Sequence, residues 1–278
     1  YGRVSRYGLV AYASSFDTIG PFANSAYDIA SVLEVIAGYD PNDSTSANLL
    51  VPEYTKYLDK NINGMKIGIP KEYMGEGLND EIKEAIELKI DYLKSKGASI
   101  VDISLPNTEY TIAAYYILTT AEASSNLARY DGARYGFRDK TAKDLEQLYT
   151  MTRSKGFGAE VKRRIMLGTF VLSAGYYDAY YKKAQRIRRL IKEDFDKAFS
   201  EVSCILTPTT PTTAFGIGEK TDDPLTMYLS DIYTVSANLA GIPGISVPVG
   251  KDKNGLPIGM QLLGKQFDEQ TIIKVADV

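Results

Sequence analysis

Residues 202–263 constrain the fold of this chain more than any other stretch, because three backbone signals follow one another there. Residues 203–207 are apolar and β-rich, and Pro208, which has no backbone N–H for a sheet ladder, predicts that this strand ends just before it. Apolar residues at helical spacing then predict a helix over residues 227–239 that Gly241 ends.

Two more strands follow, at residues 245–249 and 259–263, and the turn between them contains Asn254 and Gly255. Asn-Gly is the strongest short-range hairpin signal, because both residues tolerate the positive φ angles that tight hairpin turns need. We therefore expect an antiparallel hairpin here.

Earlier in the chain, strand patterns at residues 64–70 and 99–105 flank an amphipathic helical pattern at residues 79–96, which Gly97 ends. A helical crossover between two strands predicts that they are parallel and connected in the right-handed sense. The fold class is therefore α/β, with a mixed sheet covered by helices. Further helices are expected at residues 25–37, 107–130, 142–152, 159–172, 174–200 and 268–278.

The composition is that of an ordinary globular protein. A chain of 278 residues that is 44% hydrophobic and 24% charged can bury a large core, and we expect a single domain over residues 1–278. A net charge of -3 argues against a broad basic surface for nucleic acid, and the basic residues of 174–200 are interspersed with acidic ones, as on a solvated helix face. No membrane span or secretory signal is recognisable, so a cytoplasmic location is expected.

The chain contains no histidine, which excludes Ser-His-Asp and Cys-His hydrolysis and histidine-ligated zinc. We expect no metal site. The only cysteine, Cys204, lies in an apolar strand and is expected to be a buried hydrophobic residue. Any catalysis would need carboxylate, lysine, tyrosine or hydroxyl groups.

Two charged residues are predicted to lie at the edge of apolar helical faces. At 100° per residue, Arg164 borders the apolar face of residues 159–172, and Asp231 borders that of residues 227–239. An inward-leaning arginine and aspartate could bind the two ends of a zwitterionic amino acid. They could equally form a structural ion pair with each other.

Several runs resemble the amidase signature family. They are GIPGISVPVG at residues 241–250 and GLPIGMQLLG at residues 255–264. Within that family, YGRVSRYGLV at residues 1–10 and DPNDSTS at residues 40–46 resemble the A subunits of tRNA-dependent amidotransferases. The resemblance covers essentially the whole chain and implies a glutaminase.

The resemblance also implies which residues bind the substrate. In the matching motifs at residues 162–170 and 228–231, Arg164 corresponds to the anchor of the glutamine carboxylate and Asp231 to the partner of its ammonium group. Tyr115 resembles the tyrosine that closes over the ligand. No catalytic residue is expected in this chain, because the family's lysine and two serines would precede Tyr1.

The chain begins without methionine in a strand-like tract and ends in a helix-like one, so we interpret it as a fragment that is inactive alone. By resemblance, this chain binds no cofactor. A partner B subunit would use ATP and Mg²⁺ to activate Glu-tRNA(Gln) or Asp-tRNA(Asn), and a small C subunit would stabilise the assembly.

Two other functions stay open. A stand-alone amidase on another amide would not require both charged residues. A non-catalytic binding module is also possible, because an α/β fold alone does not imply an enzyme.

Overall fold

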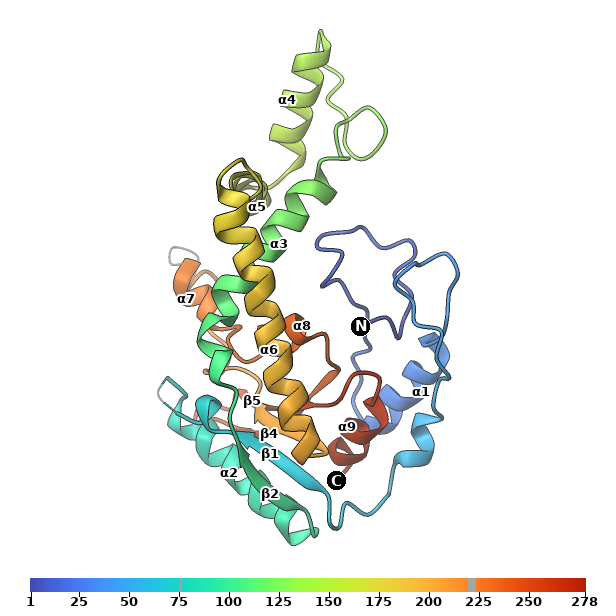
Figure 1. The fold of residues 1–278 in the computed structure, drawn as a ribbon, viewed down its shortest axis with the longest axis vertical. Coiled ribbons are helices and arrows are strands. Elements are labelled where there is room, and N and C mark those ends of the chain that lie inside the picture. Colours follow the sequence, from blue (N-terminus) through green and yellow to red (C-terminus); the bar gives the residue numbers. More distant parts are fainter. Residues whose placement is uncertain (76, 220–223) are drawn as a thin grey trace. The chain divides into compact units, whose positions relative to one another are not determined.

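The structure is a computed structural model that describes residues 1–75, 77–219 and 224–278 of the chain. Within these residues the fold is α/β, as predicted, with one mixed sheet whose strand order is β2-β1-β3-β5-β4 (Figure 1). The strands are β1 (Lys66–Pro70), β2 (Ser99–Ile103), β3 (Cys204–Pro208), β4 (Gly244–Lys251) and β5 (Pro257–Leu263). The α-helices are α1 (Ala26–Ile36), α2 (Asp80–Ser95), α3 (Thr111–Leu127), α4 (Leu145–Gly156), α5 (Ala159–Val171), α6 (Lys182–Glu201), α7 (Pro224–Leu229), α8 (Val235–Ala240) and α9 (Glu269–Ala276).

The chain groups into two compact units. The first comprises Tyr1–Tyr7, Thr18–Ile112 and Arg188–Val278 and contains the sheet, and the second comprises Gly8–Asp17 and Ala113–Ile187. The expectation of a single domain stays a prediction, since such grouping does not decide how many parts fold independently.

The predicted β-α-β unit is confirmed. Strands β1 and β2 are parallel, with Lys66 paired to Ser99, and α2 connects them. The side chain of Asn79 caps α2 by accepting a hydrogen bond from the N–H of Glu81, as expected for an N-cap residue. The apolar face of α2 is buried against the sheet, which it contacts at β2, β3, β4 and β5.

The predicted hairpin is also confirmed. Strands β4 and β5 are antiparallel, and β5 also pairs antiparallel with β3, which in turn lies parallel to β1. Strand β3 ends at Pro208, one residue later than predicted, because Pro208 still pairs with Met260. The mixed sheet therefore forms by inserting β5 between β3 and β4.

The expected continuous helix over residues 227–239 is wrong. It is divided into α7 and α8 by a turn over residues 230–234. The Oγ1 of Thr234 donates to the carbonyl of Asp231, and the N–H of Asp231 bonds to the carbonyl of Tyr228, three residues back. The N–H groups of Ser230 and Ile232 likewise bond to carbonyls three residues back, which is the spacing of turns and 3₁₀ helices, so the α-helical hydrogen-bond pattern is interrupted here.

Two other expectations are corrected. In residues 174–200, a π-helical turn at Tyr177–Tyr181 precedes α6, so the helix is not regular throughout. Residues 1–13 form only an isolated bridge between Val4 and Ala37 instead of a strand. Side chains take up the backbone donors there, because the N–H of Arg6 bonds to Asp43 at 2.8 Å.

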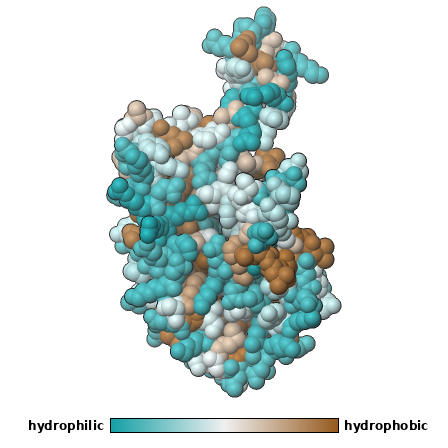
Figure 2. All heavy atoms as spheres, turned by 45° about the vertical axis from the view of Figure 1, so that its right-hand side comes forward, coloured by the Kyte–Doolittle hydropathy of each residue, from teal (hydrophilic) through white to brown (hydrophobic). Residues whose placement is uncertain are grey.

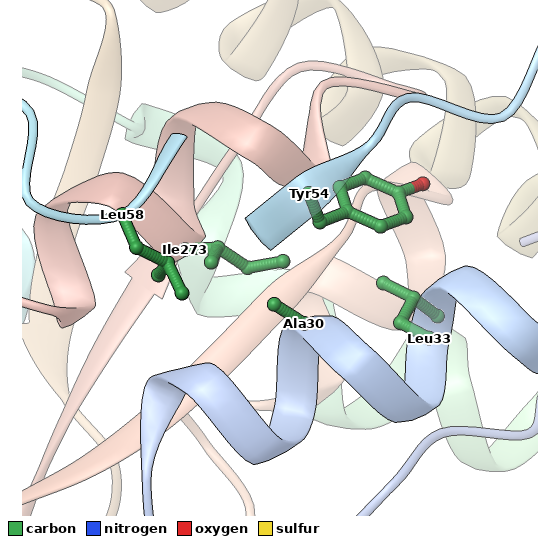
Figure 3. Close-up of a cluster of buried hydrophobic side chains, with 5 residues drawn as sticks. All are labelled: Ala30, Leu33, Tyr54, Leu58 and Ile273. Carbon is green, nitrogen blue, oxygen red and sulfur yellow. The ribbon is translucent and has the colours of Figure 1, made fainter. Parts of the chain in front are cut away.

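A small hydrophobic cluster joins three distant segments of the first unit. Ala30 and Leu33 of α1 face Tyr54 and Leu58, which lie in and beside a 3₁₀ turn, and Ile273 of α9 completes the cluster (Figure 3). All five side chains are buried. Removing them from water stabilises the association of α1 with α9.

The opposite face of α1 remains apolar and exposed. Val35 is 83% exposed and Val32 43%, and Figure 2 shows hydrophobic side chains gathered on the surface at the level of this helix. Contiguous exposed apolar surface is typical of faces that another polypeptide covers.

Most basic residues of α6 lie on the solvated face expected from the sequence, but Arg188 is partly buried and its Nε donates to the carbonyl of Leu239 at 3.0 Å. Arg189 pairs with Glu193 and Lys192 with Asp196, each at i,i+4 spacing and each exposed. Among the residues that the structure describes, no helix is long and apolar enough to cross a membrane.

Candidate ligand-binding site

The second unit holds Arg164 at the centre of a polar and aromatic cluster. Helix α5 begins after Gly158, and its spacing places Glu160 one turn before Arg164. The Nε of Arg164 donates to Glu160 at 2.8 Å, and its Nη1 donates to the hydroxyl of Tyr12 at 2.8 Å. The side chain of Arg164 is 25% exposed, and within α5 the buried residues are Gly168 and Val171.

Aromatic rings line the guanidinium group. Its central carbon lies 5.8 Å from the ring centroid of Tyr12 and 5.6 Å from that of Tyr116. Burial opposes the charged form, but the hydrogen bonds to Glu160 and Tyr12 outweigh it and raise the pKa of Arg164. Arg164 is therefore a fixed positive charge at every physiological pH.

One nitrogen of this arginine is left for a ligand. The Nε and Nη1 atoms have partners, whereas Nη2 makes no hydrogen bond to any residue in the described part of the chain. A half-buried guanidinium with a remaining donor and two flanking rings can bind a carboxylate by a charge-assisted hydrogen bond.

Tyr12 was not identified from the sequence. It lies in an irregular segment 152 residues before Arg164, and the side chains of two other residues hold that segment in place. Asp17 accepts hydrogen bonds from the N–H groups of Tyr12 and Ala13, at 2.9 and 3.1 Å, and Asn126 of α3 donates to the carbonyl of Tyr12. Asp17 was the one sequence signal for an ordered turn at Tyr12, because aspartate side chains often accept hydrogen bonds from the backbone of a turn.

The structure places the two neighbouring tyrosines of α3 in different contacts. Tyr116 packs against the guanidinium of Arg164, whereas the ring of Tyr115 makes edge contacts with Phe16 at 5.6 Å and with Tyr116 at 5.2 Å. Tyr115 therefore contacts the ring that packs against Arg164. Both tyrosines are only partly buried.

Helices α3 and α5 approach each other closely at Gly168, one turn after Arg164. A β-carbon at this position would lie within 3 Å of the Thr120 carbonyl and of Ser124. This contact brings the helix that carries Arg164 against the helix that carries Tyr116.

Asp231, the second predicted ligand residue, belongs to the first unit. It lies in the turn between α7 and α8, and not on a continuous helix as the helical spacing assumed. Its carbonyl accepts hydrogen bonds from the N–H groups of Thr234 and Val235, both at 3.0 Å, and the residue is exposed. The turn places Asp231 at the surface of that unit.

Cys204 is buried in β3, and burial raises the pKa of its thiol to about 12. The expectation of a buried, unreactive cysteine is therefore confirmed. Among residues 1–75, 77–219 and 224–278, no three carboxylate or thiol side chains gather where they could hold a metal ion.

Comparisons with known proteins agree with the fold. Residues 1–273 match the Amidase family. The A subunit of glutamyl-tRNA(Gln) amidotransferase from Persephonella marina is 63% identical over 277 residues, which is 100% of this chain and 57% of that protein. The protein of the same name from Koribacter versatilis is 61% identical, over 99% of this chain and 58% of its own length.

Solved structures of related proteins have a similar fold. The crystal structure of the glutamyl-tRNA(Gln) amidotransferase A subunit from Thermotoga maritima superposes with a TM-score of 0.79 at 41% identity, covering 99% of this chain and 55% of that one. The peptide amidase of Stenotrophomonas maltophilia has a TM-score of 0.71 at 27% identity, covering 99% of this chain and 55% of its own. The chain thus spans a little over half the length of the relatives that it matches.

Proposed function

This chain belongs to the amidase family, and we propose that it is the larger, C-terminal part of the glutaminase subunit of a tRNA-dependent amidotransferase. The observation that carries the proposal is 63% identity, over the whole chain, to a protein named as the A subunit of glutamyl-tRNA(Gln) amidotransferase. The whole enzyme would hydrolyse glutamine and use the ammonia to convert Glu-tRNA(Gln) or Asp-tRNA(Asn) into Gln-tRNA(Gln) or Asn-tRNA(Asn).

The contribution of this part is recognition of glutamine. Arg164 binds the α-carboxylate, Asp231 binds the α-ammonium group, and Tyr115 packs beside the ligand. The Nη2 of Arg164, which bonds to none of the described residues, and the two rings beside its guanidinium support the first of these roles. Holding both ends of the substrate places its amide for attack by a nucleophile in the rest of the protein.

The remaining steps belong to other parts of the enzyme. A B subunit would bind ATP and Mg²⁺ and activate the carboxylate of the mischarged tRNA, and a C subunit would stabilise the complex. The assembly would work in the cytoplasm. The exposed apolar face of α1 supports a larger assembly, because it is a surface that another polypeptide could cover.

The chain on its own should be inactive. Recognition without a nucleophile cannot form an acyl-enzyme, so purified chain should release no ammonia from glutamine above the buffer rate. An ammonia assay with the complete enzyme as positive control measures this directly.

The decisive experiment compares two nitrogen donors in the complete amidotransferase. Arg164→Ala and Asp231→Ala each remove a charged partner of glutamine, and kcat/KM for glutamine should fall by about one to two orders of magnitude. With ammonium chloride as donor, tRNA amidation should persist in both variants, because ammonium bypasses the glutaminase site.

Matched controls separate recognition from folding. Arg163→Ala removes an exposed arginine that also pairs with Glu160, and Asp91→Ala removes an exposed aspartate that pairs with Lys94. Both controls should keep near-normal activity with either donor. Equal losses with glutamine and ammonium in Arg164→Ala and Asp231→Ala would reject the binding roles.

A further inference from the structure

Buried hydrogen bonds tie the turn that carries Asp231 to the sheet of the first unit. Gln261 lies on β5, is 7% exposed and pairs across the strands with Thr207 of β3. Its Nε2 donates to the Thr207 Oγ1 at 3.0 Å and to the backbone carbonyl of Tyr233 at 3.0 Å. The amide group thus joins the sheet to the backbone two residues after Asp231.

Tyr73 supports the same turn from another direction. Its side chain is fully buried, its hydroxyl donates to the Ser236 Oγ at 2.7 Å, and its ring lies 5.0 Å from the ring of Tyr233. Ser236 is itself 1% exposed. Tyr233 is therefore held both at its carbonyl and at its ring.

Backbone hydrogen bonds of the turn link the position of Asp231 to that of Tyr233. The carbonyl of Asp231 accepts from the N–H groups of Thr234 and Val235, the two residues that follow Tyr233. A displacement of Tyr233 would break or bend these bonds. The direction of the Asp231 carboxylate consequently depends on the anchor at Tyr233.

A core position does not require a glutamine for packing. The neighbouring β5 residues Met260 and Leu262 are fully buried and apolar, and an apolar side chain could fill the site of Gln261. A buried amide costs stability unless it is hydrogen bonded, and when it is bonded it selects one geometry for its partners. At this site the selected geometry is that of the Asp231 turn.

We propose that Gln261, assisted by Tyr73, is a positioning residue for glutamine recognition, and that it acts by fixing Tyr233 so that the Asp231 carboxylate is aimed at the ammonium group of the substrate. The inference rests on the proposed function of Asp231. It assigns to Gln261 an effect on substrate affinity that exceeds its effect on the chemical step.

The test uses the complete amidotransferase and the variants Gln261→Met and Thr207→Val. Gln261→Met removes both bonds of the amide, whereas Thr207→Val removes the threonine partner and leaves the bond to Tyr233. Gln261→Met should raise KM for glutamine by about fivefold to tenfold, the loss expected for one buried hydrogen bond that aligns a charged contact. Its kcat and its ammonium-dependent rate should stay within about twofold of the parent values.

Thr207→Val should lower the melting temperature but change KM for glutamine by less than about twofold, because the Tyr233 anchor remains. Tyr73→Phe provides a second route if Gln261→Met folds poorly, since it removes only the hydroxyl bonded to Ser236. It should raise KM by about twofold to fivefold.

The outcomes separate the positioning role of Gln261 from the ligand-binding role of Asp231. If Asp231→Ala raises KM for glutamine but Gln261→Met and Tyr73→Phe do not, the positioning inference is wrong and the proposed function stands. If Thr207→Val raises KM as much as Gln261→Met, the effect is general destabilisation and the inference is rejected. If Asp231→Ala itself leaves KM unchanged, the role proposed for Asp231 fails first.

Discussion

Gly168 of α5 lies so close to Thr120 of α3 that a β-carbon at position 168 would stand 1.9 Å from the Thr120 carbonyl oxygen. No real β-carbon tolerates that distance from a backbone atom, so a side chain here would force the two helices apart. The contact between the helices that carry Arg164 and Tyr116 therefore requires a residue without a β-carbon at position 168.

Gly168→Ala should consequently destabilise the protein, although alanine is the better helix former. The gain in helix propensity is about 1 kcal/mol, whereas forced overpacking costs about 1–3 kcal/mol and more when backbone must move. Urea unfolding measures the difference. Gly20→Ala is the matched control, because a β-carbon at Gly20 meets no atom within 4 Å, and it should leave the free energy of unfolding nearly unchanged.

Arg3 forms a buried ion pair with Glu269 at 3.1 Å, and it also donates to the carbonyls of Leu50 and Phe267. Arg3→Met would leave the Glu269 carboxylate buried without its charged partner, which costs about 3–5 kcal/mol in comparable sites. The double variant Arg3→Met with Glu269→Leu should be more stable than Arg3→Met alone. The exposed Arg189→Met should cost under about 1 kcal/mol, and an equal loss at Arg3 would contradict the prediction.

Asp43 should make stability depend on pH in the acid range. Hydrogen bonds from the N–H of Arg6 and from Thr45 lower the pKa of its carboxyl to about 2. Because the folded pKa is below the unfolded value of about 3.9, the stabilisation is fully present above about pH 4 to 5 and is lost as the pH falls towards 2. Asp43→Asn should therefore be less stable than the parent at about pH 6, and the two unfolding curves should converge near pH 2. A constant difference across this range would show that Asp43 does not titrate as described.

The elements that the sequence predicted well are those that local patterns determine. The β-α-β unit follows from helical spacing between two strands, and the hairpin follows from the Asn254-Gly255 turn. The insertion of β5 beside β3 could not be read locally, because that pairing joins Thr207 to Gln261 across 54 residues. The residue pattern within each of these two strands does not specify which strand it pairs with.

The candidate site was predictable only in part. The position of Arg164 follows from helical spacing, which holds because α5 is a regular helix. The same arithmetic failed for Asp231, since the backbone around it bonds with i→i−3 spacing and forms a turn between α7 and α8 instead of a continuous helix. Tyr12 has no periodic pattern around it, so only the folded structure connects it with Arg164.

Tyr12 provides the sharpest test of the cluster around Arg164. Its hydroxyl accepts the Nη1–H of Arg164 at 2.8 Å, and this bond fixes the plane of the guanidinium while the two rings support its face. Tyr12→Phe keeps the ring and removes only the hydrogen bond. In the complete enzyme KM for glutamine should rise by about threefold to tenfold, which corresponds to one hydrogen bond to a charged group, while the ammonium-dependent rate should not change. Tyr135→Phe, at an exposed tyrosine whose ring packs on Tyr130, is the control and should behave as the parent. A Tyr12→Phe enzyme with an unchanged KM would mean that Glu160 and the rings orient Arg164 without the hydroxyl.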